Sequence, residues 1–301
     1  MESERLETGG RRRAISRLAG MRKPKMFAVL PTLLTLANAA CGFGAITFAA
    51  KVGPEPAEGY HLLIAGWLIF LAMVFDMLDG SAARWARLTS EFGAQLDSLC
   101  DAISFGVAPA FLMIQFTRYK HDLGRYLDPW FEYHPRLLWV IATLFVVCAL
   151  LRLARFNVEA DEEDSHDTFS GLPSPAAAGT VASFPIAMHG LRDLIAPGSD
   201  AATTAVAEWL TPFLKISLPL LTFAVACLMV SRFRYAHVFN QVFRGQKNRQ
   251  HLIQLVFTLA AIAMVREMAL PLIFCYFAFS APSRWLWSEV VARRWQKSPQ
   301  A

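Results

Sequence analysis

The sequence predicts an all-α fold, a polytopic transmembrane helix bundle of about eight spans. The chain is 55% hydrophobic, above the roughly 45–50% that is usual for a soluble domain. The excess gathers in long apolar runs, and about 20 such residues are enough for a helix to cross a membrane. Lysine and arginine exceed the acidic residues, giving a formal charge of +5. Because these basic residues flank the apolar runs, they indicate contact with membrane lipids and no nucleic acid.

Each predicted span is an apolar run bounded by polar or basic residues. The eight runs are 27–50, 61–79, 92–116, 137–153, 172–191, 212–231, 251–265 and 268–287. Arg266 and Glu267 interrupt the last two, so a hairpin of two spans and one long helix both stay open. The sequence thus divides into a basic N-terminal segment (1–26), a transmembrane domain (27–287) and a C-terminal tail (288–301).

The basic residues also orient the bundle. With the N-terminus inside, most of the 29 lysines and arginines fall on the cytoplasmic side, as the positive-inside rule requires. This orientation puts the cytoplasmic ends of the second and third spans, and the polar residues between positions 76 and 101, at the cytoplasmic face.

Four aspartates at these two span ends are the strongest functional signal. Asp76 and Asp79 are three residues apart, and Asp97 and Asp101 are four apart, so each pair shares a helix face. A charged carboxylate within a span costs about 2.5–3.5 kcal/mol, so such residues mark functional sites. A turn near 88–91 would fold the third span back against the second and bring the carboxylates together. Divalent cations, which prefer oxygen ligands, would relieve their repulsion.

The neighbours of the aspartates suit a ligand that contains phosphate. Gly80 and Gly93 leave room for a bulky ligand or a neighbouring helix. Ala83 and Arg84 fall near the face of Asp76, and a guanidinium suits phosphate. Acids, metal and arginine at this boundary indicate a polyphosphate bound beside a lipid tail. A solvated turn, the ion path of a divalent-cation transporter and a non-catalytic lipid-binding scaffold are the alternatives.

The pattern Asp76-x2-Asp79-Gly80-x2-Ala83-Arg84-x8-Gly93-x3-Asp97-x3-Asp101 resembles the signature of the CDP-alcohol phosphatidyltransferases. The resemblance implies that an alcohol attacks the lipid-linked phosphorus of a CDP-lipid and that CMP leaves. It implies two divalent ions, Mg²⁺ or Mn²⁺, with Asp101 also deprotonating the alcohol. The implied metal ligands are Asp76, Asp79, Asp97 and Asp101, and the implied CDP-lipid pocket is lined by Asp79, Gly80, Ala83, Arg84, Gly93 and Asp97.

Further stretches, 101–109, 151–157, 169–176 and 229–235, resemble the phosphatidylserine synthase branch of that family. The implied substrates are CDP-diacylglycerol and L-serine, and the implied products are phosphatidylserine and CMP. The carboxylate of serine suits an arginine fork. The residues expected to bind serine are Ser104, Arg152, Arg155 and Asn157. Glycerol 3-phosphate, inositol phosphate and choline stay open as other acceptors.

The resemblance also implies a homodimer. The predicted location is the inner (cytoplasmic) membrane of a bacterium. For the acidic loop 159–167, a solvated segment, a second metal site and a gate for serine entry stay open. Asn38, with Gly42 and Gly44, gives the first span a small polar face, for which helix packing is the expected role.

Overall fold

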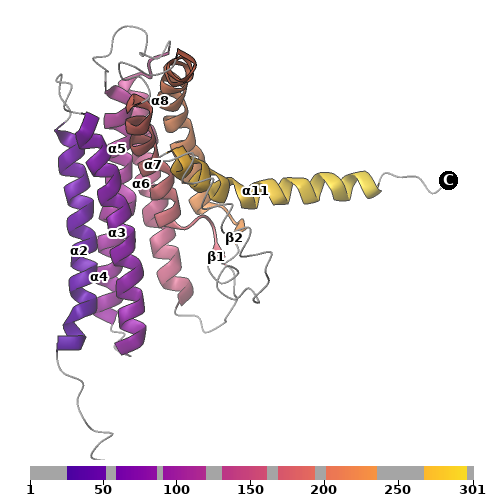
Figure 1. The fold of residues 1–301 in the computed structure, drawn as a ribbon. Helices are drawn as coiled ribbons and strands as arrows, with labels where there is room; N and C mark the ends of the chain where they lie inside the picture. The colour runs from indigo at the N-terminus through magenta and orange to yellow at the C-terminus, as the bar shows by residue number, and fades with distance from the viewer. Residues whose placement is uncertain are drawn as a thin grey trace, which may run out of the picture.

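The computed structural model describes residues 26–51, 59–86, 91–119, 131–160, 169–193, 201–235 and 268–296. Within these ranges the predicted all-α fold is confirmed (Figure 1). The helical elements are α2 (Met26–Ala50), α3 (Gly59–Ala86), α4 (Glu91–Asp101), η2 (Ala102–Val107), α5 (Ala108–Arg118), α6 (Pro135–Ala160), α7 (Ser174–Asp193), α8 (Ala201–Val230) and α11 (Ala269–Gln296). Two strands of two residues each, β1 (Phe169–Ser170) and β2 (Arg234–Tyr235), complete the described elements.

Five helical stretches of the described part are long and apolar enough to cross a membrane, which makes this an integral membrane protein. They are Val29–Ala50, Gly59–Ser81, Glu91–Arg118, Pro135–Val158 and Thr204–Val230. Each overlaps a predicted span. The predicted spans 172–191 and 268–287 are helical as α7 and α11 but do not meet the same criteria. The run 251–265 lies outside the described residues, so the count of eight stays a prediction.

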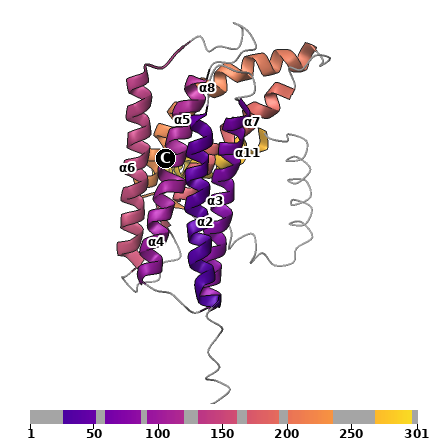
Figure 2. The same ribbon diagram turned by 90° about the vertical axis from the view of Figure 1, so that its left-hand side faces the viewer.

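The third span is one continuous helix with a change of winding in its middle. A π-helical turn, η2, follows α4 directly after Asp101 and leads into α5. π-Turns rotate the following side chains relative to a regular α-helix and are frequent at functional sites. Here the turn packs against both α2 and α6, so it sets how the residues after Asp101 face the first span. Figure 2 shows α2, α3, α4 and α6 running along the same axis.

Helix α7 lies in the interior of the bundle and contacts α3, α5, α8 and α11. Most of its side chains are small, and Ala177, Ala178, Val181 and Ala182 are fully buried. Small residues allow close helix approach in membranes, where association depends on packing. This interior position explains why α7 lacks the strong apolar pattern of the lipid-facing spans.

The strands join two sequence stretches that are far apart in the chain. Phe169 pairs with Tyr235 in an antiparallel register, and the Gly171 N–H donates to the Phe233 carbonyl at 2.9 Å. Gly171 has φ = +86°, and a Cβ there would collide with the Met229 carbonyl oxygen. Only glycine adopts this conformation and proximity without strain. The stretches 169–176 and 229–235 therefore lie side by side.

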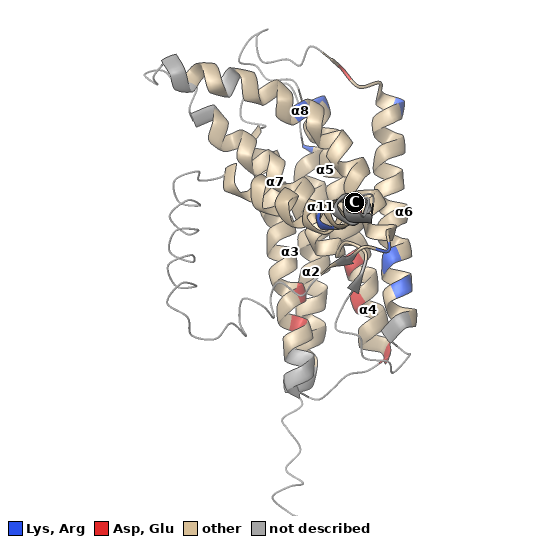
Figure 3. Ribbon diagram, turned by 90° about the vertical axis from the view of Figure 1, so that its right-hand side faces the viewer, with Lys and Arg blue, Asp and Glu red and all other residues tan. Residues whose placement is uncertain are grey.

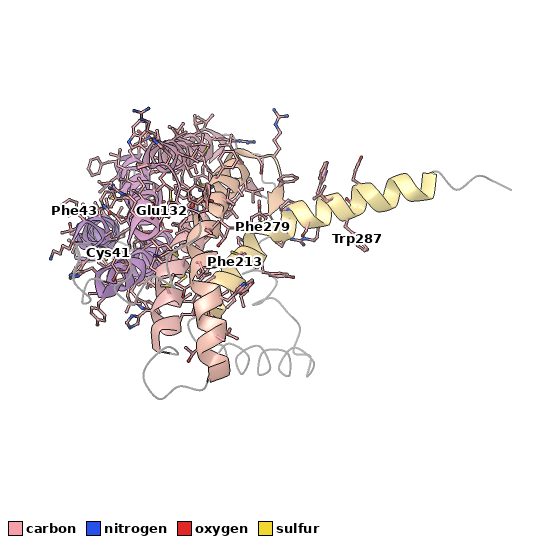
Figure 4. All side chains as sticks on the ribbon, turned by 90° about the horizontal axis from the view of Figure 1, so that it is seen from above. Cys41, Phe43, Glu132, Phe213, Phe279 and Trp287 are labelled. Atoms are coloured by element: carbon pink, nitrogen blue, oxygen red, sulfur yellow. The ribbon has the colours of Figure 1, made fainter. Side chains whose placement is uncertain are left out.

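Helix α11 departs from the direction of the other helices. Its first half packs on α7, and the buried Tyr235 hydroxyl donates to the Ala278 carbonyl at 2.8 Å. Burial raises the pKa of Tyr235 to about 12, so this hydroxyl stays a neutral donor. The second half projects away from the bundle and carries the exposed Trp285 and Trp287 (Figures 1 and 4). The helix also continues beyond the predicted boundary at 287.

Two further predictions concern the connections. The acidic loop predicted at 159–167 begins later than expected, because α6 continues to Ala160. Positions 161–168 lie outside the described residues, as do 1–25 of the basic N-terminal segment and 297–301 of the tail.

Candidate functional site

Three carboxylates from two helices meet at one end of the bundle. One oxygen each from Asp76 on α3 and from Asp97 and Asp101 on α4 lie within 4.8 Å of one another. Acidic positions of α3 and α4 and basic positions of α6 occupy the same end in Figure 3. The structure therefore brings together three of the four predicted metal ligands, from the two helices α3 and α4.

The fourth aspartate faces α2. Asp79 is 5% exposed, and its carboxylate lies beside the Thr35 hydroxyl and the Gly80 backbone N–H. Residues three apart on a helix differ by about 60° in direction. That difference turns Asp79 toward the first span, while Asp76 faces α4.

The donor set fits a divalent cation. Asp97 Oδ1 and Asp79 Oδ2 are buried and have no hydrogen-bond partner within the described residues. A buried polar atom without a partner is unfavourable. Carboxylate oxygens are the ligands that Mg²⁺ and Mn²⁺ prefer, so a cation would satisfy atoms that the described part of the chain leaves unpaired.

Helix α2 contributes a polar group that the sequence analysis assigned to packing. The Asn38 Nδ2 donates to Asp101 Oδ1 at 2.9 Å. The Ser104 hydroxyl, predicted to line the acceptor pocket, donates to the Asn38 backbone carbonyl at 2.9 Å. Both side chains are fully buried. A lone amide in an otherwise apolar span was the available signal, since such a group needs a buried partner.

Arg152 lies at the same end of the bundle, on α6. Its Nη1 donates to the Ser174 hydroxyl at 2.7 Å, and its charge acts on Asp101 and Asp76. The Arg152 Nε is buried and unpartnered in the part of the chain that the structure describes. The guanidinium therefore retains a donor beside the carboxylate cluster. Ser174, at the start of α7, was missed by the sequence analysis.

The other two residues predicted to bind serine lie differently. Arg155 is exposed. Asn157 exchanges hydrogen bonds with Ser98, with Nδ2 donating at 2.9 Å and Oδ1 accepting at 3.2 Å. Ser98 directly follows Asp97, so this pair fixes α6 against α4 beside the cluster.

The other predicted nucleotide-pocket residues lie on the same two helices as the aspartates. Gly80 is half-buried on α3, and Gly93, also half-buried, lies one turn before Asp97 on α4. Ala83 and Arg84 belong to the final turns of α3. Their side chains lie outside the described part of the chain.

Fold and site together define a polytopic membrane protein with an acidic, cation-binding type of centre at one end of its bundle. The profile of the CDP-alcohol phosphatidyltransferase family matches residues 28–213. The matched region contains all four aspartates of the predicted signature. The chain belongs to the CDP-alcohol phosphatidyltransferase family.

Curated relatives carry related names. A Mycobacterium bovis protein named CDP-diacylglycerol–serine O-phosphatidyltransferase is 34% identical over 154 residues, which are 50% of this chain and 46% of that protein. A Helicobacter pylori protein of the same name is 33% identical over 150 residues, 50% of this chain and 54% of its own. Archaetidylserine synthase of Methanothermobacter thermautotrophicus is 33% identical over 221 residues, 72% of this chain and 73% of its own. The chain spans about half the length of the first two relatives.

Proposed function

We propose that this protein transfers the phosphatidyl group of CDP-diacylglycerol to L-serine, giving phosphatidylserine and CMP. The observation that carries the proposal is the meeting of Asp76, Asp97 and Asp101 within 4.8 Å in a chain of this family. The names of the relatives from Mycobacterium bovis and Helicobacter pylori support serine as the acceptor.

In the proposed reaction the serine hydroxyl oxygen forms a bond to the lipid-linked phosphorus. The bond between that phosphorus and the oxygen bridging to CMP breaks, and CMP leaves with the bridging oxygen. Asp101 takes the hydroxyl proton, because a general base must be within hydrogen-bond reach of the group that it deprotonates. Its position at 9% exposure limits competition from bulk water.

The proposed metal ligands are Asp76, Asp79, Asp97 and Asp101, for two Mg²⁺ or Mn²⁺ ions. When bound, these ions would neutralise the diphosphate and the charge that develops on the leaving CMP. The residues proposed to line the CDP-lipid pocket are Asp79, Gly80, Ala83, Arg84, Gly93 and Asp97. Gly80 and Gly93 would let the diphosphate approach the backbone of α3 and α4.

The serine site is proposed beside Arg152. Two observations support a guanidinium that binds the serine carboxylate: the Arg152 Nε has no partner among the described residues, and the group lies close enough to Asp101 and Asp76 to interact with their charges. We assign Arg155 and Asn157 to the rim of this site and Ser104 to its buried wall.

We further propose a homodimer of this chain in a bacterial inner membrane, with the N-terminus and the site facing the cytoplasm. Residues 27–287 would form the catalytic domain, preceded by a basic segment and followed by the tail 288–301. The concentration of basic residues in 1–26 supports this orientation.

An acceptor panel tests the proposal. Purified protein with CDP-diacylglycerol is given L-serine, glycerol 3-phosphate, inositol phosphate or choline, each with Mg²⁺, with Mn²⁺ and with EDTA, and CMP release is measured. We expect release with serine, none with EDTA, and recovery when the cation is restored. If CMP is released only with one of the other alcohols, that alcohol replaces serine as the proposed acceptor. Cation flux into liposomes without any CMP release would favour the transporter instead.

A further inference from the structure

We propose that Asn38 is a positioning residue for Asp101: its amide orients the carboxylate that accepts the proton of the alcohol. The inference rests on the proposed function, because that function gives Asp101 its role as general base. It adds the first span, which lies outside the aspartate pattern, to the machinery of the site.

The contact is direct and buried. Asn38 is fully buried on α2, and its Nδ2 donates to Asp101 Oδ1 at 2.9 Å across 63 positions of sequence. A hydrogen bond from an amide to a carboxylate is charge-assisted and stronger than a neutral one. The bond holds one carboxylate oxygen toward α2 and leaves the other for the site.

Asn38 is itself held in place. The Ser104 hydroxyl donates to the Asn38 backbone carbonyl at 2.9 Å, and Gly42 lies one turn further along α2. A Cβ on Gly42 would collide with the Ser104 hydroxyl and lie 2.7 Å from the Ser104 Cα. The close approach of η2 to α2 therefore requires glycine at this position. This Asn38–Ser104 contact forms at the π-helical turn that follows Asp101.

The amide does more than join two helices. In the described part of the chain its side chain makes one hydrogen bond, to Asp101, and its Oδ1 has no partner. A buried polar side chain that served packing alone would be expected to satisfy both ends. The asymmetry directs the Asn38 side chain toward the carboxylate.

The experiment compares wild type with Asn38→Leu, which keeps the number and branching of the side-chain heavy atoms and removes the donor. With CDP-diacylglycerol, L-serine and saturating Mn²⁺, we expect kcat to fall about 10–100-fold, the range for residues that orient metal-site carboxylates. Both KM values should change less than about threefold. Mn²⁺ titration by electron paramagnetic resonance, without substrates, should show a Kd raised by about tenfold or more.

Two more variants complete the set. Ser104→Ala, which removes the hydrogen bond to the Asn38 backbone carbonyl, should lower kcat. Thr47→Val is the matched control, because Thr47 lies on α2 and its exposed hydroxyl donates to the Phe43 carbonyl of the same helix. Its kinetics and Mn²⁺ affinity should equal those of wild type.

Wild-type kcat and Mn²⁺ affinity in Asn38→Leu would overturn the inference. The inference would also be overturned if the activity lost in Asn38→Leu came from a higher KM for serine instead of a lower kcat, because Asn38 would then contact the substrate. If Asn38→Leu does not fold, an unchanged kcat in Ser104→Ala overturns it. If wild type released no CMP, the proposed function would be refuted. The Mn²⁺ titration would still test whether Asn38 positions Asp101.

Discussion

Replacing Arg152 tests which substrate its guanidinium binds. The group is held by the 2.7 Å bond to Ser174, and its buried Nε beside the cluster has no partner within the ranges that the structure describes. A hydrogen bond from a charged group is worth about 1.5–3 kcal/mol, which corresponds to about 10- to 150-fold in affinity. We expect Arg152→Ala to raise the KM for serine by this factor and the KM for CDP-diacylglycerol less than about threefold.

Neighbouring arginines supply the comparison. Arg155 is exposed, and an exposed charged contact contributes about 0.2–1 kcal/mol, so Arg155→Ala should raise the KM for serine less than about sixfold. Arg136, exposed at the other end of α6, is the matched control and should change neither KM. Arg152→Lys keeps the charge without the planar fork and should fall between wild type and Arg152→Ala.

The assay is CMP release at varied serine and fixed saturating CDP-diacylglycerol, and then the reverse. An equal rise in the KM for serine and the KM for CDP-diacylglycerol would refute the assignment, since Arg152 would then not be specific to the serine site. A KM for serine within twofold of wild type in Arg152→Ala would also refute it.

Two further predictions address the fold and the metal ligands. Gly171→Ala should destabilise the protein by about 2–4 kcal/mol, because a left-handed conformation costs a non-glycine residue about 1–2 kcal/mol and separating the strands removes backbone hydrogen bonds. Thermal unfolding in detergent measures this loss of stability. Gly106→Ala is the control, because its Cβ would meet only an ordinary contact at 3.6 Å. An unfolding temperature of Gly171→Ala equal to that of wild type would contradict the strand geometry. Asp97→Asn should lower kcat at least about 100-fold with an unchanged unfolding temperature, and wild-type turnover would remove Asp97 from the metal site.

The sequence predicted the elements more completely than their contacts. Apolar runs became helices because a span must satisfy its backbone hydrogen bonds internally, and helical spacing put Asp97 and Asp101 on one face. Helical spacing also put Asp76 and Asp79 on one face, but it did not show that they point toward different neighbouring helices. Their directions depend on which neighbouring helix each faces, and that is a property of packing rather than of spacing.

Other contacts depend on chain segments too distant for any local pattern. Asn38 is a polar residue in an apolar run by sequence, and its partner, Asp101, becomes known only when α4 is placed against α2. Arg152 and Arg155 look equivalent by sequence, yet only Arg152 faces Ser174, at the start of α7. The direction of α11 depends likewise on its contact with α7, since its composition alone resembles a span.

The stretches that resemble the phosphatidylserine synthase branch are physically connected to one another. Arg152 belongs to the stretch 151–157, and Ser174, which accepts its hydrogen bond, belongs to the stretch 169–176. The stretch 169–176 is in turn fixed to the stretch 229–235, where the Gly171 N–H donates to the Phe233 carbonyl. A disturbance of the strand pair should therefore reach the proposed serine site through Ser174 and leave the aspartates of α3 and α4 in place. Under the proposed function, acceptor recognition and CDP-lipid binding would rest on separate sets of contacts, and substitutions in the two sets should then change different KM values.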